Sequence, residues 1–158
     1  MRGKKFFKKD NLEPDARYNR LDVAKFINYK IKRKKKSVER KIVYDVFELI
    51  KEKTKKDPIQ TWEKALKNVG PSVEIRGRRV GGANYQVPFP VKDKRRFTLA
   101  IRWIIAAAKQ IKGKSMAEKL AQILIDSAKG EGSAVKKKQD VHRMAQANRA
   151  FAHFAKFG

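Results

Sequence analysis

The amino-acid sequence predicts a mainly α-helical fold, a bundle of about six helices with one protruding β-hairpin. Along most of the 158 residues, apolar side chains recur at the spacing of an amphipathic helix. Between residues 72 and 91 the apolar residues alternate instead, on both sides of a Gly81-Gly82 pair that tolerates the positive φ of a tight turn. The length and the 41% of hydrophobic residues suit one globular domain over residues 20–158, preceded by a basic N-terminal arm over residues 1–19.

Three helices are expected before the hairpin. The first, over residues 21–31, has four apolar residues near helical spacing, which are Leu21, Ala24, Ile27 and Ile31. Ser37 is a candidate N-cap for the second helix, whose apolar residues run from Val38 to Ile50. The third follows Asp57-Pro58, a capping side chain before a proline at the first helical position, and it ends at Gly70-Pro71.

Three more helices are expected after the hairpin. The fourth begins at about Lys94, and its apolar residues run to Ile111. Ser115 and Glu118 have the spacing of a capping box at the start of the fifth helix, which ends before Gly130. The sixth is expected from about Val135 to Phe154, with one face formed by Val141, Met144, Ala145, Asn148, Phe151 and Ala152. We assign all of these apolar stripes to the core.

The net charge is the strongest indication of a partner. The chain has 41 Lys and Arg against 16 Asp and Glu, a formal charge of +25, and this excess repels itself. A polyanion relieves the repulsion, because lysine and arginine contacts to phosphates release condensed counterions. The charge therefore favours a nucleic acid over two alternatives, an anionic membrane surface and a merely solubilising charge. No apolar run is long enough to cross a bilayer and no signal peptide is recognisable, so we expect an intracellular, soluble protein.

The sequence offers little for catalysis or for a cofactor. It has no cysteine, and its two histidines, His142 and His153, would lie about 16 Å apart on one helix, too far to share a metal ion. Gly113-Lys114-Ser115 lacks the first glycine of a phosphate-binding P-loop and is better explained as a helix–helix turn. No nucleophilic triad is suggested. We therefore expect no enzyme, no metal site and no cofactor, and we favour a packing role for His142 over contact with RNA or an acidic neighbour.

Basic residues gather in the arm, in the first interhelical loop, in the hairpin and at the starts of the fourth and sixth helices. A solvated surface explains one such run, but several runs in the loops of one small domain favour a binding surface. Between Arg76 and Arg102 the chain has six arginines and only two lysines. Because arginine binds phosphate bidentately and stacks on bases, we expect specific RNA contacts there and a general electrostatic attraction from the lysines. The alternative is an ordinary hairpin packed on the bundle.

Four segments of the sequence resemble one known family. They are Val73–Pro88 (VEIRGRRVGGANYQVP), Ala100–Ile104 with Lys114–Ala117, Ala134–Ala145 (AVKKKQDVHRMA) and Ala147–Phe154. In this order they resemble the S-seven family of small-subunit ribosomal proteins in its bacterial form, over nearly the whole chain. The sequence departs from the family's pattern at Lys34, where a glycine is usual, and in its last residues.

The resemblance implies a protein that binds the 3′ major domain of small-subunit rRNA and nucleates assembly of the subunit's head. The residues expected to bind rRNA are Lys8, Lys9, Lys34, Lys35, Lys36, Arg76, Arg78, Arg79, Arg95, Arg96, Arg102, Lys114, Lys136, Lys137 and Arg143. The residues expected near exit-site tRNA and mRNA are Arg78, Arg79, Gly81, Gly82 and Tyr85. The resemblance further implies a neighbouring small-subunit ribosomal protein and a cytoplasmic, ribosome-bound location.

Two other functions stay open at this point. A repressor that binds its own messenger would use the same basic surface, so the sequence does not separate it from an rRNA-binding protein. A nuclease is a weaker hypothesis, because it requires a cluster of acidic metal ligands and the acidic residues here stand singly among cations.

Overall fold

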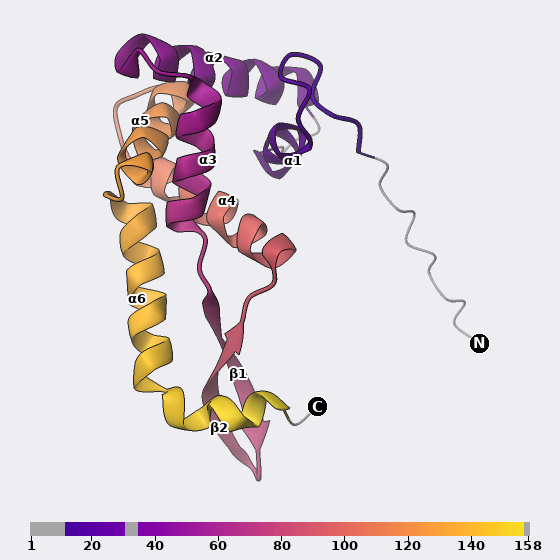
Figure 1. Ribbon diagram of the computed structural model, residues 1–158, viewed down its shortest axis with the longest axis vertical. Helices are drawn as coiled ribbons and strands as arrows, with labels where there is room; N and C mark the ends of the chain where they lie inside the picture. The colour runs from indigo at the N-terminus through magenta and orange to yellow at the C-terminus, as the bar shows by residue number, and fades with distance from the viewer. Residues whose placement is uncertain (1–11, 31–34, 157–158) are drawn as a thin grey trace, which may run out of the picture. The chain divides into compact units, whose positions relative to one another are not determined.

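The computed structural model describes residues 12–30 and 35–156, shown in Figure 1. In this part of the chain it has six α-helices, one 3₁₀-helix and one two-stranded hairpin, which confirms the expected mainly α fold class. The chain divides into two compact units, Met1–Arg40 and Lys41–Gly158. Lys8, Lys9, Ile31 and Lys34, named above for the arm, the first helix and the first loop, lie outside the described residues.

In the first unit a turn at Asp15 precedes helix α1 (Leu21–Lys30). The Asp15 carboxylate is buried and accepts hydrogen bonds from the backbone N–H groups of Arg17 at 3.0 Å and Tyr18 at 3.1 Å. Leu21 is 48% exposed, so its assignment to the core is wrong. The buried residues of α1 are offset from Leu21 around the helix, and they are Val23, Ala24, Phe26 and Ile27.

Helix α2 (Lys36–Thr54) begins before its expected cap. The Glu39 N–H already donates to the Lys35 carbonyl at 3.2 Å, so Ser37 lies inside the first turn and its assignment as the N-cap is wrong. Val38 is 50% exposed and is not a core residue, because the buried residues of α2 begin at Val43. Only the later turns of this helix therefore contribute to the core.

Helix α3 (Pro58–Val69) begins and ends as the sequence predicts. The Asp57 carboxylate accepts a hydrogen bond from the Ile59 N–H at 3.0 Å, and Pro58 occupies the first helical position, where no amide donor is needed. Trp62 is fully buried and meets Phe47 of α2 edge-to-face, with ring centroids 6.0 Å apart. This aromatic contact joins α3 to α2 inside the core of the second unit.

The hairpin consists of β1 (Val73–Val80) and β2 (Ala83–Pro90), paired antiparallel. Gly81 and Gly82 form the two-residue turn with φ of +58° and +86°, backbone geometry that glycine adopts without strain. This fixes the register that the sequence left open, and it sets Arg78 opposite Tyr85. In Figure 1 the hairpin extends away from α3 and α4, as expected of a protruding hairpin.

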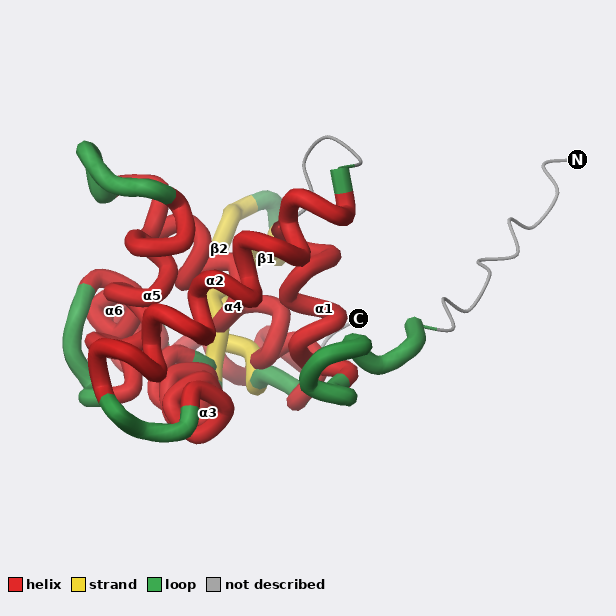
Figure 2. The backbone as a smooth tube through the Cα atoms, turned by 90° about the horizontal axis from the view of Figure 1, so that it is seen from above, coloured by secondary structure: helices red, strands yellow, loops and turns green. Residues whose placement is uncertain are grey.

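Helices α4 (Asp93–Gln110) and α5 (Met116–Ala128) complete the bundle with α3. The three helices contact one another, and Figure 2 shows them from above. Their fully buried side chains include Ile104 on α4 and Leu124 on α5. The expected capping box is present at Ser115 and Glu118, so the helix–helix turn interpretation of Gly113-Lys114-Ser115 is confirmed.

The last expected helix is two elements. Helix α6 (Ser133–Ala147) ends before Asn148, and a 3₁₀-helix η1 (Arg149–Lys156) follows, so the expectation of one helix to Phe154 is wrong. Met144 is 46% exposed and Ala152 is also exposed, so the assignment of these two residues to the core is wrong. Residues three apart eclipse in a 3₁₀-helix, which brings the rings of Phe151 and Phe154 to the same side. Both rings pack on Tyr85 of the hairpin, and this contact stabilises the 3₁₀-helix.

Candidate nucleic-acid interface

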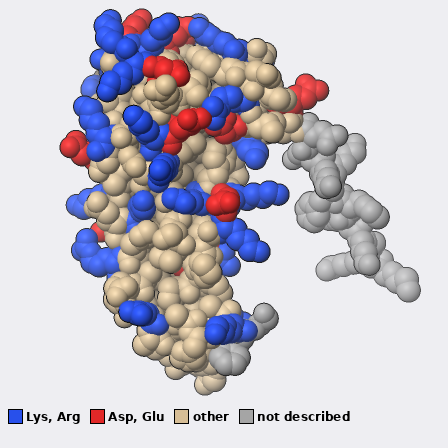
Figure 3. Space-filling view, in the orientation of Figure 1, with Lys and Arg blue, Asp and Glu red and all other residues tan. Residues whose placement is uncertain are grey.

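Basic side chains are spread over the described chain and outnumber the acidic ones that lie among them. Figure 3 shows lysine and arginine side chains dispersed over the helices, with only a few at the hairpin end of this face. Most of the basic residues that the sequence singled out are exposed, including Arg79, Arg102, Lys136 and Lys137. Their exposure suits contact with a large polyanion rather than with a small enclosed ligand.

A buried carboxylate organises two of the predicted arginines at the base of the hairpin. Glu74 is 7% exposed, and each of its two oxygens serves one arginine. Oε1 accepts from Nε of Arg76 at 2.8 Å, and Oε2 accepts from Nε of Arg95 at 3.2 Å and from its Nη2 at 3.1 Å. The cluster joins strand β1 to the start of α4, and it brings together two arginines that stand 19 positions apart in the chain.

Glu74 stays ionised in this setting. Its burial acts to raise the pKa of the carboxyl, but the hydrogen bonds and positive charges of Arg76 and Arg95 outweigh that effect and lower the pKa. The arginine side chains remain 53% and 42% exposed. Each guanidinium is therefore held on one edge by the carboxylate, while its outer donors face solvent.

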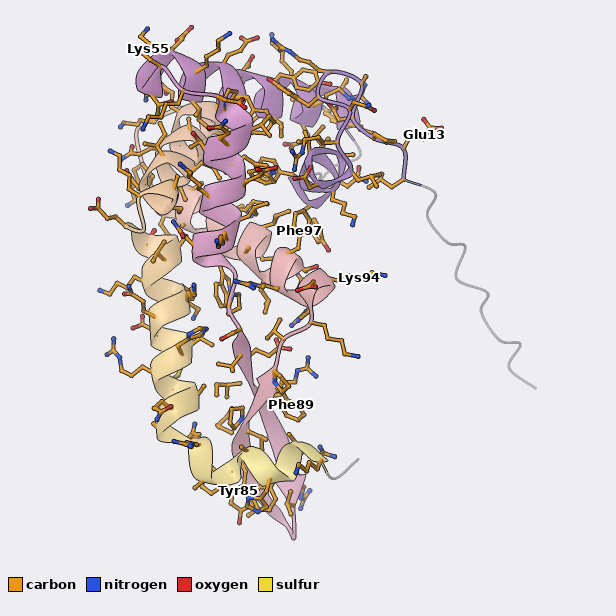
Figure 4. The ribbon with its side chains drawn as sticks, viewed as in Figure 1. Glu13, Lys55, Tyr85, Phe89, Lys94 and Phe97 are labelled. Atoms are coloured by element: carbon orange, nitrogen blue, oxygen red, sulfur yellow. The ribbon has the colours of Figure 1, made fainter. Side chains whose placement is uncertain are left out.

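Arg76 has a second contact that restricts it. Its guanidinium lies over the ring of Phe89, 5.1 Å from the ring centroid, in a cation–π arrangement. Phe89 belongs to β2, and Figure 4 shows it on the hairpin between the start of α4 and η1. An arginine fixed by both a carboxylate and an aromatic ring loses less side-chain entropy when it binds a phosphate.

The tip half of the hairpin is tied to the C-terminal segment. Nη1 of Arg78 donates to the Phe154 carbonyl at 3.0 Å, and the Tyr85 ring lies 5.1 Å from Phe151 and 4.9 Å from Phe154. Tyr85, expected near tRNA and mRNA, is thus half-buried by packing within the protein. Arg79, next to Arg78 along the strand, points to the opposite face and is exposed.

The connection between α3 and β1 is held by side chains from α4 and α6. Nε of Arg96 donates to the Gly70 carbonyl at 3.3 Å, and Nζ of Lys138 donates to the Asn68 carbonyl at 3.0 Å. A Cβ atom at residue 70 would lie 2.9 Å from the Arg96 side chain, so any larger residue there would force Arg96 to shift. Arg96 therefore positions the hairpin's entry strand in addition to carrying charge.

His142 also belongs to this connection. Its Nε2 accepts a hydrogen bond from the Ser72 N–H at 3.2 Å, in agreement with the packing role favoured above. Partial burial and the nearby charges of Lys138 and Arg96 lower the pKa of His142. A neutral imidazole is the form that can accept this hydrogen bond.

The remaining predicted residues lie apart from the Glu74 cluster. Nζ of Lys114 donates to Oε1 of Gln122 at 3.0 Å, and Arg143 pairs with Asp140 at 3.1 Å. Within the described chain, no ion pair or hydrogen bond joins them, Lys136 or Lys137 to the cluster. Lys35 and Lys36 are exposed at the start of α2, in the first unit.

Sequence reasoning missed Glu74. Its neighbours Val73 and Ile75 alternate with it, and alternation alone does not say which face of a strand is buried. An acidic residue flanked by arginines in a strand was the available signal.

Neither a metal-ligand cluster nor a membrane-spanning helix occurs among the described residues. There is no group of three or more His, Cys, Asp or Glu side chains there that could hold a metal ion. No helix in the described part of the chain is both long and apolar enough to cross a membrane.

Comparison with known proteins places the sequence in a family. The family model described as ribosomal protein S7p/S5e matches residues 1–149. A small ribosomal subunit protein uS7 from Caldanaerobacter subterraneus subsp. tengcongensis is 55% identical over 141 residues, which cover 89% of this chain and 90% of the relative. The protein of that name from Chloroflexus aggregans is 51% identical over 145 residues, 92% of each chain. The one from Thermotoga maritima is 51% identical over 146 residues, 92% of this chain and 94% of the relative.

The family match spans the six α-helices, the hairpin and its arginines, and it agrees with the resemblance seen in the sequence. The chain therefore belongs to the ribosomal protein S7p/S5e family, a family of structural, non-enzymatic ribosomal proteins.

Proposed function

We propose that this protein binds the 3′ major domain of small-subunit rRNA, nucleates assembly of the subunit's head, and sets its hairpin near exit-site tRNA and mRNA. Family membership supports a ribosomal role, and the relatives are named as proteins of the small ribosomal subunit. Neighbouring small-subunit ribosomal proteins are its expected protein partners, on cytoplasmic ribosomes. The observation that carries the proposal is the pair of arginines held half-exposed by Glu74.

The pair suits a folded RNA because its geometry is set before binding. Arg76 and Arg95 share one buried carboxylate, so the two guanidinium groups keep a fixed separation. Two fixed forks match the spacing of particular phosphates, whereas mobile lysines adapt to any backbone. The chain's excess of cations adds attraction that does not depend on RNA structure.

The tip of the hairpin suits a second RNA close by. Gly81 and Gly82 are exposed and carry no side chains, so another backbone can approach the turn closely. Arg79 is exposed beside the turn and supplies a positive charge there. Packing of Tyr85 on Phe151 and Phe154 stiffens the ribbon behind the tip, and an isolated two-stranded ribbon would be only marginally stable.

The test measures binding to a 3′ major domain fragment of rRNA and to a random duplex of equal length. Replacing Arg76 or Arg95 by alanine should weaken fragment binding by about 1–3 kcal/mol where the contact is bidentate, and duplex binding much less. Arg40→Ala, an exposed arginine of α2, is the matched control and should change the two affinities by similar small factors. Equal affinity of the wild type for fragment and duplex would contradict the proposal.

A further inference from the structure

A groove of about 600 Å³ opens beside the Glu74 cluster, between β2, the start of α4 and η1. Four cationic side chains line it, which are Arg76, Lys92, Arg95 and Lys156. The rest of the lining is apolar and comes from prolines, alanines and Phe89. No acidic side chain of the described chain lines the groove. The nearby Glu74 carboxylate is buried and accepts hydrogen bonds from Arg76 and Arg95.

The cations come from both sides of the groove. Arg76 and Arg95 are fixed by Glu74, whereas Lys92 and Lys156 are exposed. Neither lysine forms an ion pair with any residue that the structure describes. Both ammonium groups are therefore available to an anionic ligand seated between the hairpin and η1.

Two of the side chains that line the groove, Arg76 and Phe89, are planar. The Arg76 guanidinium lies over the Phe89 ring, which gives an arginine and an aromatic side chain in contact with each other. Bases of unpaired RNA are bound by stacking on just these two kinds of side chain. The volume of the groove lies within the range of small-ligand sites, so it can admit one nucleotide but not a duplex.

From this combination we infer that the groove is a subsite for a single unpaired ribonucleotide. The base lies against Phe89 and Arg76, and the phosphate meets Lys92 and Lys156. This inference rests on the proposed function and deepens it, since it adds base recognition to phosphate contacts. Unpaired nucleotides of rRNA, mRNA and tRNA share this chemistry, so the source of the nucleotide is decided by experiment.

The first experiment uses the full-length protein and short single-stranded RNA with one 2-aminopurine, a base whose fluorescence changes on stacking. Phe89→Leu should weaken binding about fivefold or more, because it removes base–aromatic stacking, and Phe89→Tyr should retain it. Lys92→Ala and Lys156→Ala should each flatten the salt dependence of single-strand binding by about 0.7 units. Lys94→Ala is the matched control, because Lys94 is an exposed lysine of α4 outside the groove, and it should leave the salt dependence of single-strand binding unchanged.

A blunt duplex of equal length gives the contrast. Its affinity should not respond to the Phe89 variants, because a paired base does not enter the groove. The lysine variants replace exposed side chains, so they keep the test valid even where a Phe89 variant fails to fold. Equal effects of Lys92→Ala, Lys156→Ala and Lys94→Ala on the single strand would overturn the subsite.

The same variants are then measured against the 3′ major domain fragment, a tRNA and an mRNA-like single strand. The RNA whose affinity falls most in Lys92→Ala and Lys156→Ala is the source of the nucleotide. Strong fragment binding that none of the groove variants changes would overturn an rRNA source. If the groove variants also left single-strand binding unchanged, the subsite would be overturned and the proposed function would still stand. Failure of the wild type to prefer the fragment over the duplex would contradict the proposed function itself.

Discussion

Two basic regions of the second unit differ in how they hold their charges. At the hairpin base, two arginines surround a buried carboxylate and one lies over an aromatic ring. At the other region, a groove of about 450 Å³ near the junction of α2, α3 and α5 is lined by Lys53, Lys56, Lys64 and Lys129, together with one acidic residue, Asp126. None of these four lysines forms an ion pair within residues 12–30 and 35–156.

The hairpin base offers cations in a fixed geometry, whereas the lysine-lined groove offers only positive charge. A fixed arginine can distinguish one arrangement of phosphates from another, because its donors form a rigid planar fork. A mobile lysine attracts any polyanion and is screened by salt over about 8–10 Å. Both regions raise the positive charge of the protein, but we expect only the hairpin base to select among RNAs.

The largest expected effect comes from removing the organising carboxylate. Glu74→Gln keeps the side chain's shape and removes its charge, which weakens the hydrogen bonds to Arg76 and Arg95. Because hydrogen bonds to charged groups contribute more than neutral ones, the free energy of unfolding should fall by about 1–3 kcal/mol. Urea denaturation at pH 7 measures this, with the exposed Glu131→Gln as the matched control. An unchanged midpoint would show that Glu74 does not hold the hairpin base.

The Glu74→Gln variant also predicts how the stability of the protein depends on pH in the acidic range. The pKa of Glu74 is lowered from its ordinary value of 4.5, so the ionised carboxylate stabilises the fold at every pH above that value. This contribution is lost as the pH falls from about 4.5 through the folded-state pKa. The stability difference between wild type and Glu74→Gln should therefore be constant near pH 7 and shrink below about pH 4.5. If the stability difference between the two proteins grew on acidification, the folded-state pKa of Glu74 would be raised and not lowered.

Most helices and the hairpin were predictable because their signals are local. Caps such as Asp57-Pro58 and the glycine pair at the turn act over a few residues, and the structure has them where the sequence indicates. The errors at Val38 and Met144 concern burial, which depends on the elements that cover a helix face and not on the helix itself. The break after Ala147 was missed because residues three apart suit an α-helix as well as a 3₁₀-helix.

In the site, too, the features that depend on residue type were predictable and those that depend on the tertiary fold were not. Composition alone pointed to arginines between residues 76 and 102 as the specific contacts, since arginine chemistry belongs to the residue type. The role of Glu74 was not predictable, because its partner Arg95 lies on another element 21 positions away. The cover of Tyr85 by Phe151 and Phe154 likewise depends on a fold that returns the C-terminal segment to the hairpin.

A smaller effect is expected from the lysine-lined groove. Replacing Lys53, Lys56, Lys64 and Lys129 together by glutamine should lower affinity for the rRNA fragment and for a random duplex by the same factor, roughly a few-fold, and flatten both salt dependences. Filter binding at several salt concentrations measures the two slopes. If the fragment alone lost affinity, the lysines would be selective contacts and the contrast between the two regions would fail.

The smallest effect concerns the link between α6 and the hairpin. His142 accepts the Ser72 N–H at 3.2 Å, and partial burial with the charges of Lys138 and Arg96 lowers its pKa from 6.5. For a histidine with a lowered folded-state pKa, the stabilising contribution is present above about pH 6.5 and is lost as the pH falls through the folded-state value, because the unfolded chain takes up the proton first. Urea midpoints between pH 7.5 and 5 should therefore fall more steeply for the wild type than for His142→Asn, which keeps an acceptor that does not titrate. Parallel curves for the two proteins would mean that the imidazole is no part of the link, which would then depend on contacts such as those of Arg96 and Lys138.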